Sequence, residues 1–133
     1  MDAILIPVAP GELIDKLTIL RLKRERIADP AKLANVRHEE AMLGAVAAGL
    51  PPSPRLAELW QELYAINARL WVIEDDIRNR ERAGDFGPRF IALARAVYRV
   101  NDERAAVKKA INLHLGSALI EEKSYADYGS DDA

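Results

Sequence analysis

LWVIEDDIRNRERAGDFGPRFIALARAV, residues 70–97, contains a short Gly and Pro break between two apolar repeats. On both sides of the break, apolar residues recur three and four positions apart, which is the spacing of one helix face. Glycine commonly ends a helix and proline is suited to the first turn of the next one, so the pattern predicts helices over residues 54–83 and 88–115. A turn of only a few residues makes two such helices antiparallel.

Two shorter helices precede this pair. Apolar spacing predicts them over residues 11–28 and 31–48, separated by Asp29-Pro30, which combines a preferred N-cap with a first-turn proline. We expect residues 3–8 to form an extended lead-in and residues 117–125 to form a strap docked on the helices. The fold is therefore predicted to be all-α, an antiparallel helical bundle of four helical segments in a single domain of residues 1–125. Residues 126–133, rich in Gly, Ser and Asp, are predicted to be a disordered tail.

Composition limits the classes of function. The 133 residues have a formal net charge of -2, which provides no overall basic field for nucleic-acid binding, and they include no Cys. Thiolate metal sites and disulfides are thereby excluded, in keeping with a reducing compartment. The first residues lack the basic and apolar regions of a signal peptide, and no stretch reaches the ~20 apolar residues of a membrane span. We expect a cytoplasmic protein that binds neither nucleic acid nor membrane.

Three charged residues interrupt the apolar faces of the predicted helices, namely Arg24, Glu74 and Arg104. Burying a lone charge costs several kcal/mol, so these positions predict a partly polar interior. In an antiparallel pair with a tight turn, Asn67 lies opposite Arg104, whereas Glu74 lies about 10 Å away along the helix axis. We therefore expect Glu74 to meet Arg24, or a different cation, across the bundle.

The leading hypothesis for function is binding through this polar interior. An excess of cations in a sheltered place favours an anionic small molecule or a partner protein, with Glu74 as the orienting counter-charge. The predicted ligand-binding residues are Arg24, Asn67, Glu74, Asn101, Arg104 and Lys108. No metal site or cofactor is expected, since the acids Glu12 and Asp15 lack a paired second element.

Two alternatives stay open. In the first, the protein is a cofactor-independent enzyme in which Glu74 is the general acid or base while Arg24 and Arg104 hold an anionic substrate. In the second, the charges form a purely structural ion network and the chain is an interaction module. Apolar residues Ile19 and Leu22 lie outside the main face of their helix, and this surplus apolar surface favours a homodimer.

Several long strings resemble those of a family of small, uncharacterised bacterial all-helical proteins, a domain of unknown function. The strings are PGELIDKLTIL (10–20), KLANVRHE (32–39), LWVIEDDIRNRE (70–81), FIALARAVYRVNDERAAVKKAIN (90–112) and GSALIEEKSY (116–125). The resemblance covers almost the whole chain. It implies that residues 117–125 belong to the domain, and it implies no particular activity.

Overall fold

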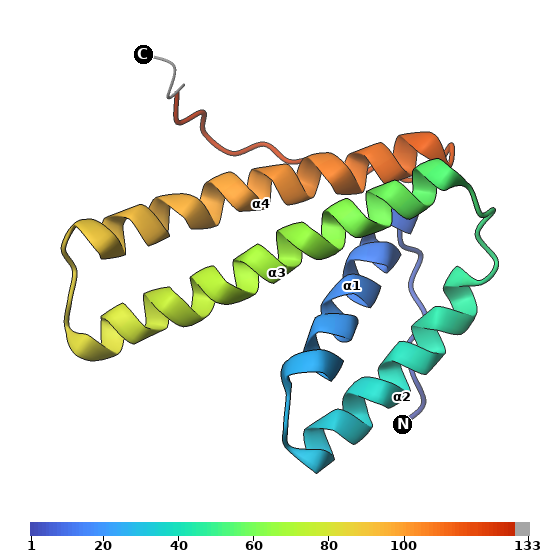
Figure 1. The fold of residues 1–133 in the computed structure, drawn as a ribbon. Helices are drawn as coiled ribbons and strands as arrows, with labels where there is room; N and C mark the ends of the chain where they lie inside the picture. The colour runs from blue at the N-terminus through green and yellow to red at the C-terminus, as the bar shows by residue number, and fades with distance from the viewer. Residues whose placement is uncertain (130–133) are drawn as a thin grey trace.

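The computed structural model describes residues 1–129 and contains four α-helices in that range, with no strand (Figure 1). They are α1 (Pro10–Arg26), α2 (Pro30–Ala47), α3 (Pro54–Ala83) and α4 (Pro88–His114). Two shorter helices and two long ones are thus present, and the prediction of an all-α antiparallel bundle is confirmed.

Local sequence explains where the helices begin and end. Each helix has a proline in its first turn, where the missing N–H costs no hydrogen bond. Asp29 caps α2 by accepting a hydrogen bond from the Lys32 backbone N–H at 2.9 Å. Ser53 caps α3 in the same way. Gly84 ends α3 with φ 67°, a left-handed conformation that glycine adopts without steric cost.

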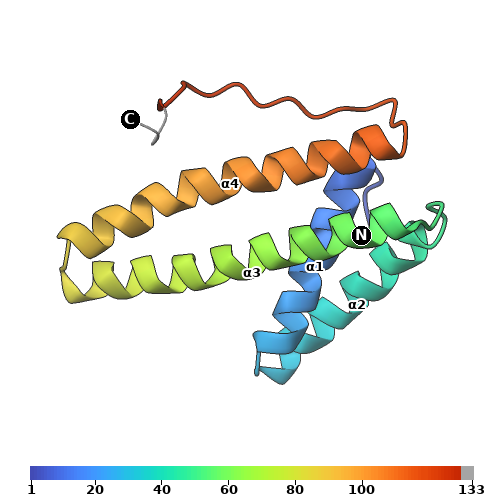
Figure 2. The ribbon, with the colours of Figure 1, turned by 45° about the horizontal axis from the view of Figure 1, so that its top comes forward.

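The helices form two hairpins that cross. Helices α3 and α4 lie antiparallel along their whole length, and α1 packs against both of them. Helix α2 packs against α1 alone. In both views α1 crosses behind the α3–α4 hairpin near one end, and the other end of the hairpin projects beyond it (Figures 1 and 2). The fold is therefore a bundle only where α1 crosses.

The apolar core lies at this crossing. Ile14 of α1, Leu59 and Leu63 of α3 and Ile111 of α4 are all at most 4% exposed and pack together. Helix α2 contributes a single buried residue, Val36. The core is consequently small, and most of the surface of α2 and of the projecting hairpin faces outward.

Both ends of the described chain are extended. Residues 1–8 are exposed, including Ile4 and Leu5 at 77% and 92%. The C-terminal segment, residues 117–129, runs back along α4 (Figure 2). Part of the predicted tail, residues 126–129, belongs to this segment, and residues 130–133 lie outside the described residues. Within residues 1–129, no helix combines the length and apolar character needed to cross a membrane.

Candidate functional site

A buried carboxylate, Asp15 of α1, is the centre of the polar interior. Its side chain is 1% exposed and receives hydrogen bonds from two helices. From α4, Arg104 donates through Nε to Oδ1 at 2.9 Å and through Nη2 to Oδ2. From α3, Asn67 Nδ2 donates to the same Oδ1 at 3.0 Å and to Thr18 Oγ1 at 2.9 Å. We call Asp15, Thr18, Asn67 and Arg104 the polar cluster.

The side chains of the polar cluster find hydrogen-bond partners in one another. The Thr18 hydroxyl donates to the backbone carbonyl of Asp15 at 2.7 Å. Among the described residues, no buried side-chain nitrogen or oxygen lacks a hydrogen-bond partner. The hydrogen bonds from Arg104 to Asp15 outweigh the effect of burial and raise the pKa of Arg104 above its ordinary value. The cluster thus holds a charge pair whose members need no ligand.

A close helix contact positions α1 for this arrangement. The Gly11 backbone N–H donates to Asn112 Oδ1 of α4 at 2.7 Å, in a buried position. A Cβ atom at Gly11 would lie 2.3 Å from the backbone oxygen of Lys108. Only glycine permits this approach, and it brings the first turns of α1, with Glu12 and Asp15, against α4.

Lys108 lies one turn of α4 beyond Arg104 and is held between two acids. Its Nζ donates to Glu12 at 2.7 Å and to Glu121 at 3.1 Å. The lysine side chain is 12% exposed, whereas that of Glu121 is 59% exposed. Burial lowers the pKa of Lys108, but the hydrogen bonds to Glu12 and Glu121 raise it by more, so the net pKa lies above its ordinary value.

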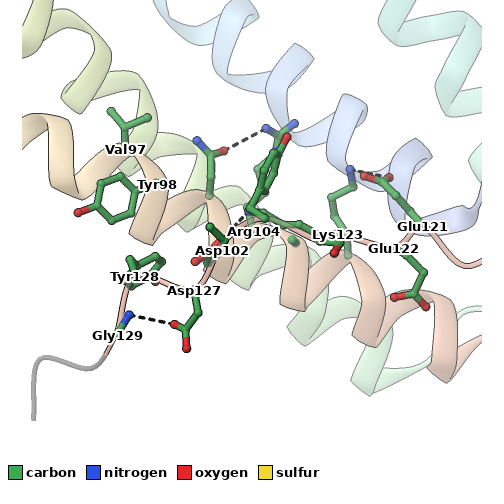
Figure 3. Close-up of a pocket in the computed structure, with 16 residues that line it drawn as sticks. Val97, Tyr98, Asp102, Arg104, Glu121, Glu122, Lys123, Asp127, Tyr128 and Gly129 are labelled. Carbon is green, nitrogen blue, oxygen red and sulfur yellow. Dashed lines mark hydrogen bonds and ion pairs between the residues drawn. The ribbon is translucent and has the colours of Figure 1, made fainter.

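Further polar contacts hold the C-terminal segment on α4. Lys123 Nζ donates to Asp102 at 2.5 Å, and Lys109 Nζ lies 3.3 Å from Glu122. Tyr128 packs on Tyr98 with ring centroids 4.9 Å apart (Figure 3). Hydrogen bonds from Lys123 and then Tyr128 hold the pKa of Asp102 below its ordinary value. The segment is therefore attached by exposed side chains along its length.

A hollow of about 1270 Å³ separates the C-terminal segment from α4. Arg104, Lys108 and Asn101 line it from the helix, and Glu121, Lys123 and Tyr125 line it from the segment. Figure 3 shows the segment running beside α4 with its side chains at the edge of the hollow. The hollow is thus bounded by charged side chains of both signs, from α4 on one side and from the C-terminal segment on the other.

Four of the six predicted site residues come together here. Asn67 and Arg104 meet at Asp15, Arg104 Nη1 lies 3.5 Å from Asn101 Oδ1, and Lys108 is on the next turn. The other two do not join them. Arg24 pairs with Glu40 of α2 at 2.8 Å, and Glu74 pairs with Arg78 on the same helix.

The expectation that Glu74 meets Arg24 is therefore wrong. Arg24 lies on the part of α1 that faces α2, since it pairs there with Glu40. Glu74 lies beyond Trp71, over which the last residue of α1, Arg26, places its guanidinium. The combination of Glu74, Arg24 and Arg104 that an enzyme would use is not formed.

The expected excess of cations is also absent, because three acids that were not predicted as counter-charges lie beside the cations. Asp15, Glu12 and Glu121 neutralise Arg104 and Lys108. A signal for Asp15 does exist in the sequence, because Gly11, Asp15, Thr18 and Leu22 follow a four, three, four spacing and all four are buried. In the described residues, no group of three His, Asp or Glu side chains is arranged to hold a metal ion.

Comparison with known proteins gives a family but no function. Neither the curated proteins nor the solved structures contain a match to this chain. A family of unknown function, DUF6165, matches residues 4–131. The match includes all four helices and the whole C-terminal segment, 117–129. The chain therefore belongs to this family of unknown function, as its sequence motifs predicted.

Proposed function

We propose that this chain is a binding protein for a carboxylate-bearing anion, with Lys108 as the principal contact. One observation carries the proposal. The half-buried ammonium of Lys108 has the carboxylate of Glu12 of α1 on its inner side and the more exposed carboxylate of Glu121 on its outer side. We infer that Glu121 occupies the place of the ligand.

The outer carboxylate is exchangeable on energetic grounds. Exposed ion pairs are each worth about 0–1 kcal/mol, and such pairs hold residues 121–123 on α4. An external carboxylate can replace Glu121 without disturbing any contact between helices. Arg104 Nη1, whose bond to Asn101 is long at 3.5 Å, provides a second donor at the same hollow.

The structural alternative explains the polar cluster but leaves Lys108 unexplained. Asp15, Arg104 and Asn67 are saturated by one another and need no further role. Lys108 instead depends on an extended segment for one of its two counter-charges. An acidic segment of a partner protein would supply the same chemistry as a free carboxylate. We further propose that binding takes place in the cytoplasm of a bacterium.

Calorimetric titration with succinate tests this proposal in the full-length chain. Glu121→Ala removes an internal competitor worth about 0–1 kcal/mol, and we therefore expect succinate to bind this variant up to about fivefold more tightly than the wild type. Glu122→Ala is the matched control, because the neighbouring Glu122 pairs with the more exposed Lys109. This control should bind succinate as the wild type does.

Lys108→Met is the third variant. When it is combined with Glu121→Ala, the gain in succinate affinity should be lost. A second titration uses a peptide of residues 117–125 in place of succinate, and preference for the peptide would indicate a protein ligand. The proposal fails if Glu121→Ala gains no affinity for either probe, or if the gain persists without Lys108.

A further inference from the structure

One side of the α3–α4 hairpin is covered by no helix in the described part of the chain. Helix α1 crosses behind the hairpin, so α3 and α4 face outward on the near side (Figure 1). Arg104 and Lys108 mark the side of α4 that contacts α1, and on the face turned away from them residues recur at alternating spacings of four and three, as in a coiled coil. They are Ala92, Ala96, Arg99, Glu103, Ala106, Ala110 and Leu113, and we call them the open face.

Four of the seven open-face residues are exposed, and the other three, Ala96, Arg99 and Ala110, are half-buried, with Ala110 packed against the core. Leu113 is 60% exposed, and Val72 of the neighbouring α3 is 50% exposed. Two depressions of about 520 and 580 Å³ lie along the open face, both lined by Arg69, Ala92 and Ala96, and the second is also lined by Arg26 from the end of α1. Alanine side chains allow a second helix to approach closely, and apolar residues on an outward face favour a partner.

The charges of the open face on one copy are complementary to those on a second copy that runs antiparallel to it. When a second α4 runs antiparallel about a two-fold axis midway between Arg99 and Glu103, each Arg99 faces Glu103 of the other copy. In the same register Ala96 faces Ala106, and Ala92 faces Ala110. A two-fold interface requires this reciprocity, in which one residue contacts another and the second contacts the first.

The exposed area also fits a dimer. The chain exposes 9034 Å², whereas a folded monomer of this length ordinarily exposes about 7000 Å². The extended ends and the one-sided hairpin both contribute to the excess. Stable interfaces remove roughly 1200–2000 Å² in total from the two partners, or roughly 600–1000 Å² from each, so the part of the excess that lies on the hairpin need only be about half of the whole.

We propose that two copies of this chain pair antiparallel through the open face of α4, joined by reciprocal Arg99–Glu103 ion pairs between flanking alanines. Lys108 and its two counter-charges, Glu12 and Glu121, are not members of the open face, although the C-terminal segment borders that face at Ala106. Dimer formation requires no residue of the Lys108 site.

Charge exchange tests the pairing in solution. Light scattering coupled to gel filtration should give the wild-type chain the mass of two copies at micromolar concentrations. Arg99→Glu and Glu103→Arg each place like charges face to face, so each variant alone should elute with the mass of one copy. An equimolar mixture of the two variants, or the double variant, restores opposite charges and should again give the mass of two copies.

Folding is monitored in parallel by circular dichroism, because Glu103 also pairs with Arg69 at 3.1 Å on the surface. The chain has no cysteine, so a double variant Ala96→Cys with Ala106→Cys should form a disulfide-linked dimer on oxidation. Ala92→Cys with Ala106→Cys, one helical turn out of register, should not. A wild-type mass of one copy throughout, or failure of the mixture to associate, overturns the proposal.

Discussion

Removal of Arg104 should destabilise the fold more than neutralisation of its counter-charge, Asp15. Arg104→Met leaves Asp15, which is 1% exposed, as a buried carboxylate without a counter-charge. Breaking a buried pair in this way costs about 3–5 kcal/mol of unfolding free energy. Asp15→Asn leaves the guanidinium of Arg104, which is 29% exposed and can turn toward water. We expect this second loss to be smaller, about 2–3 kcal/mol.

Urea unfolding followed by circular dichroism, at one protein concentration, measures both losses. The double variant Asp15→Asn with Arg104→Met should lose less than the sum of the single losses, with a coupling of about 2 kcal/mol. Arg24→Met is the control, because Arg24 and Glu40 are exposed and such pairs contribute about 0–1 kcal/mol. Additive losses, or a loss at Arg104 no larger than that at Arg24, would refute the role given to the polar cluster.

Three further predictions concern the surroundings of the site. Gly11→Ala should lower stability by more than about 2 kcal/mol, because its Cβ meets the Lys108 backbone oxygen, whereas Gly44→Ala, with nothing within 4 Å, should raise stability by about 0.5–1 kcal/mol in the same denaturation assay. Asn112→Ala should cost about 1–3 kcal/mol, since the buried Gly11 N–H loses its acceptor; a neutral result would indicate that water replaces it. Asp102→Asn should let tyrosinate absorbance develop at lower pH than in the wild type, because the hydrogen bond to Asp102 raises the pKa of Tyr128. The raised pKa also means that this contact holds the C-terminal segment below the ordinary tyrosine pKa and releases it as the pH rises through the folded value.

Helix periodicity and turn residues were sufficient to predict the four helices. The prolines at positions 30, 54 and 88 mark the observed first turns, and Gly84 marks the end of α3. The tight turn after Gly84 fixes the register of α3 on α4, which is why Asn67 and Arg104 were placed near each other correctly. Both converge on Asp15.

Helix periodicity and turn residues could not predict that the two hairpins cross. Periodicity shows which side of α1 is apolar, but the angle at which α1 crosses depends on the close contact of Gly11 with α4. That crossing buries Asp15 and leaves Glu74 in the projecting part of the hairpin. Arg24, Glu74 and Arg104 all interrupt apolar helix faces in the sequence, but only Arg104 lies in the polar interior.

The C-terminal segment was the other source of error. Its position along α4 is set by exposed ion pairs, including Lys108 with Glu121 and Lys123 with Asp102. Such pairs leave no periodic signal, because an extended segment pairs with a helix through side chains of different reach. The counter-charge of Lys108 could therefore not be found from spacing alone.

A crystal structure of the Glu121→Ala variant with succinate tests most directly whether Lys108 is a carboxylate site. We expect a succinate oxygen at hydrogen-bond distance from Lys108 Nζ, in the place that Glu121 holds in the wild type, with Glu12 still bound on the inner side. Succinate bound elsewhere, or a Lys108 that contacts Glu12 alone at saturating succinate, would contradict the proposed function.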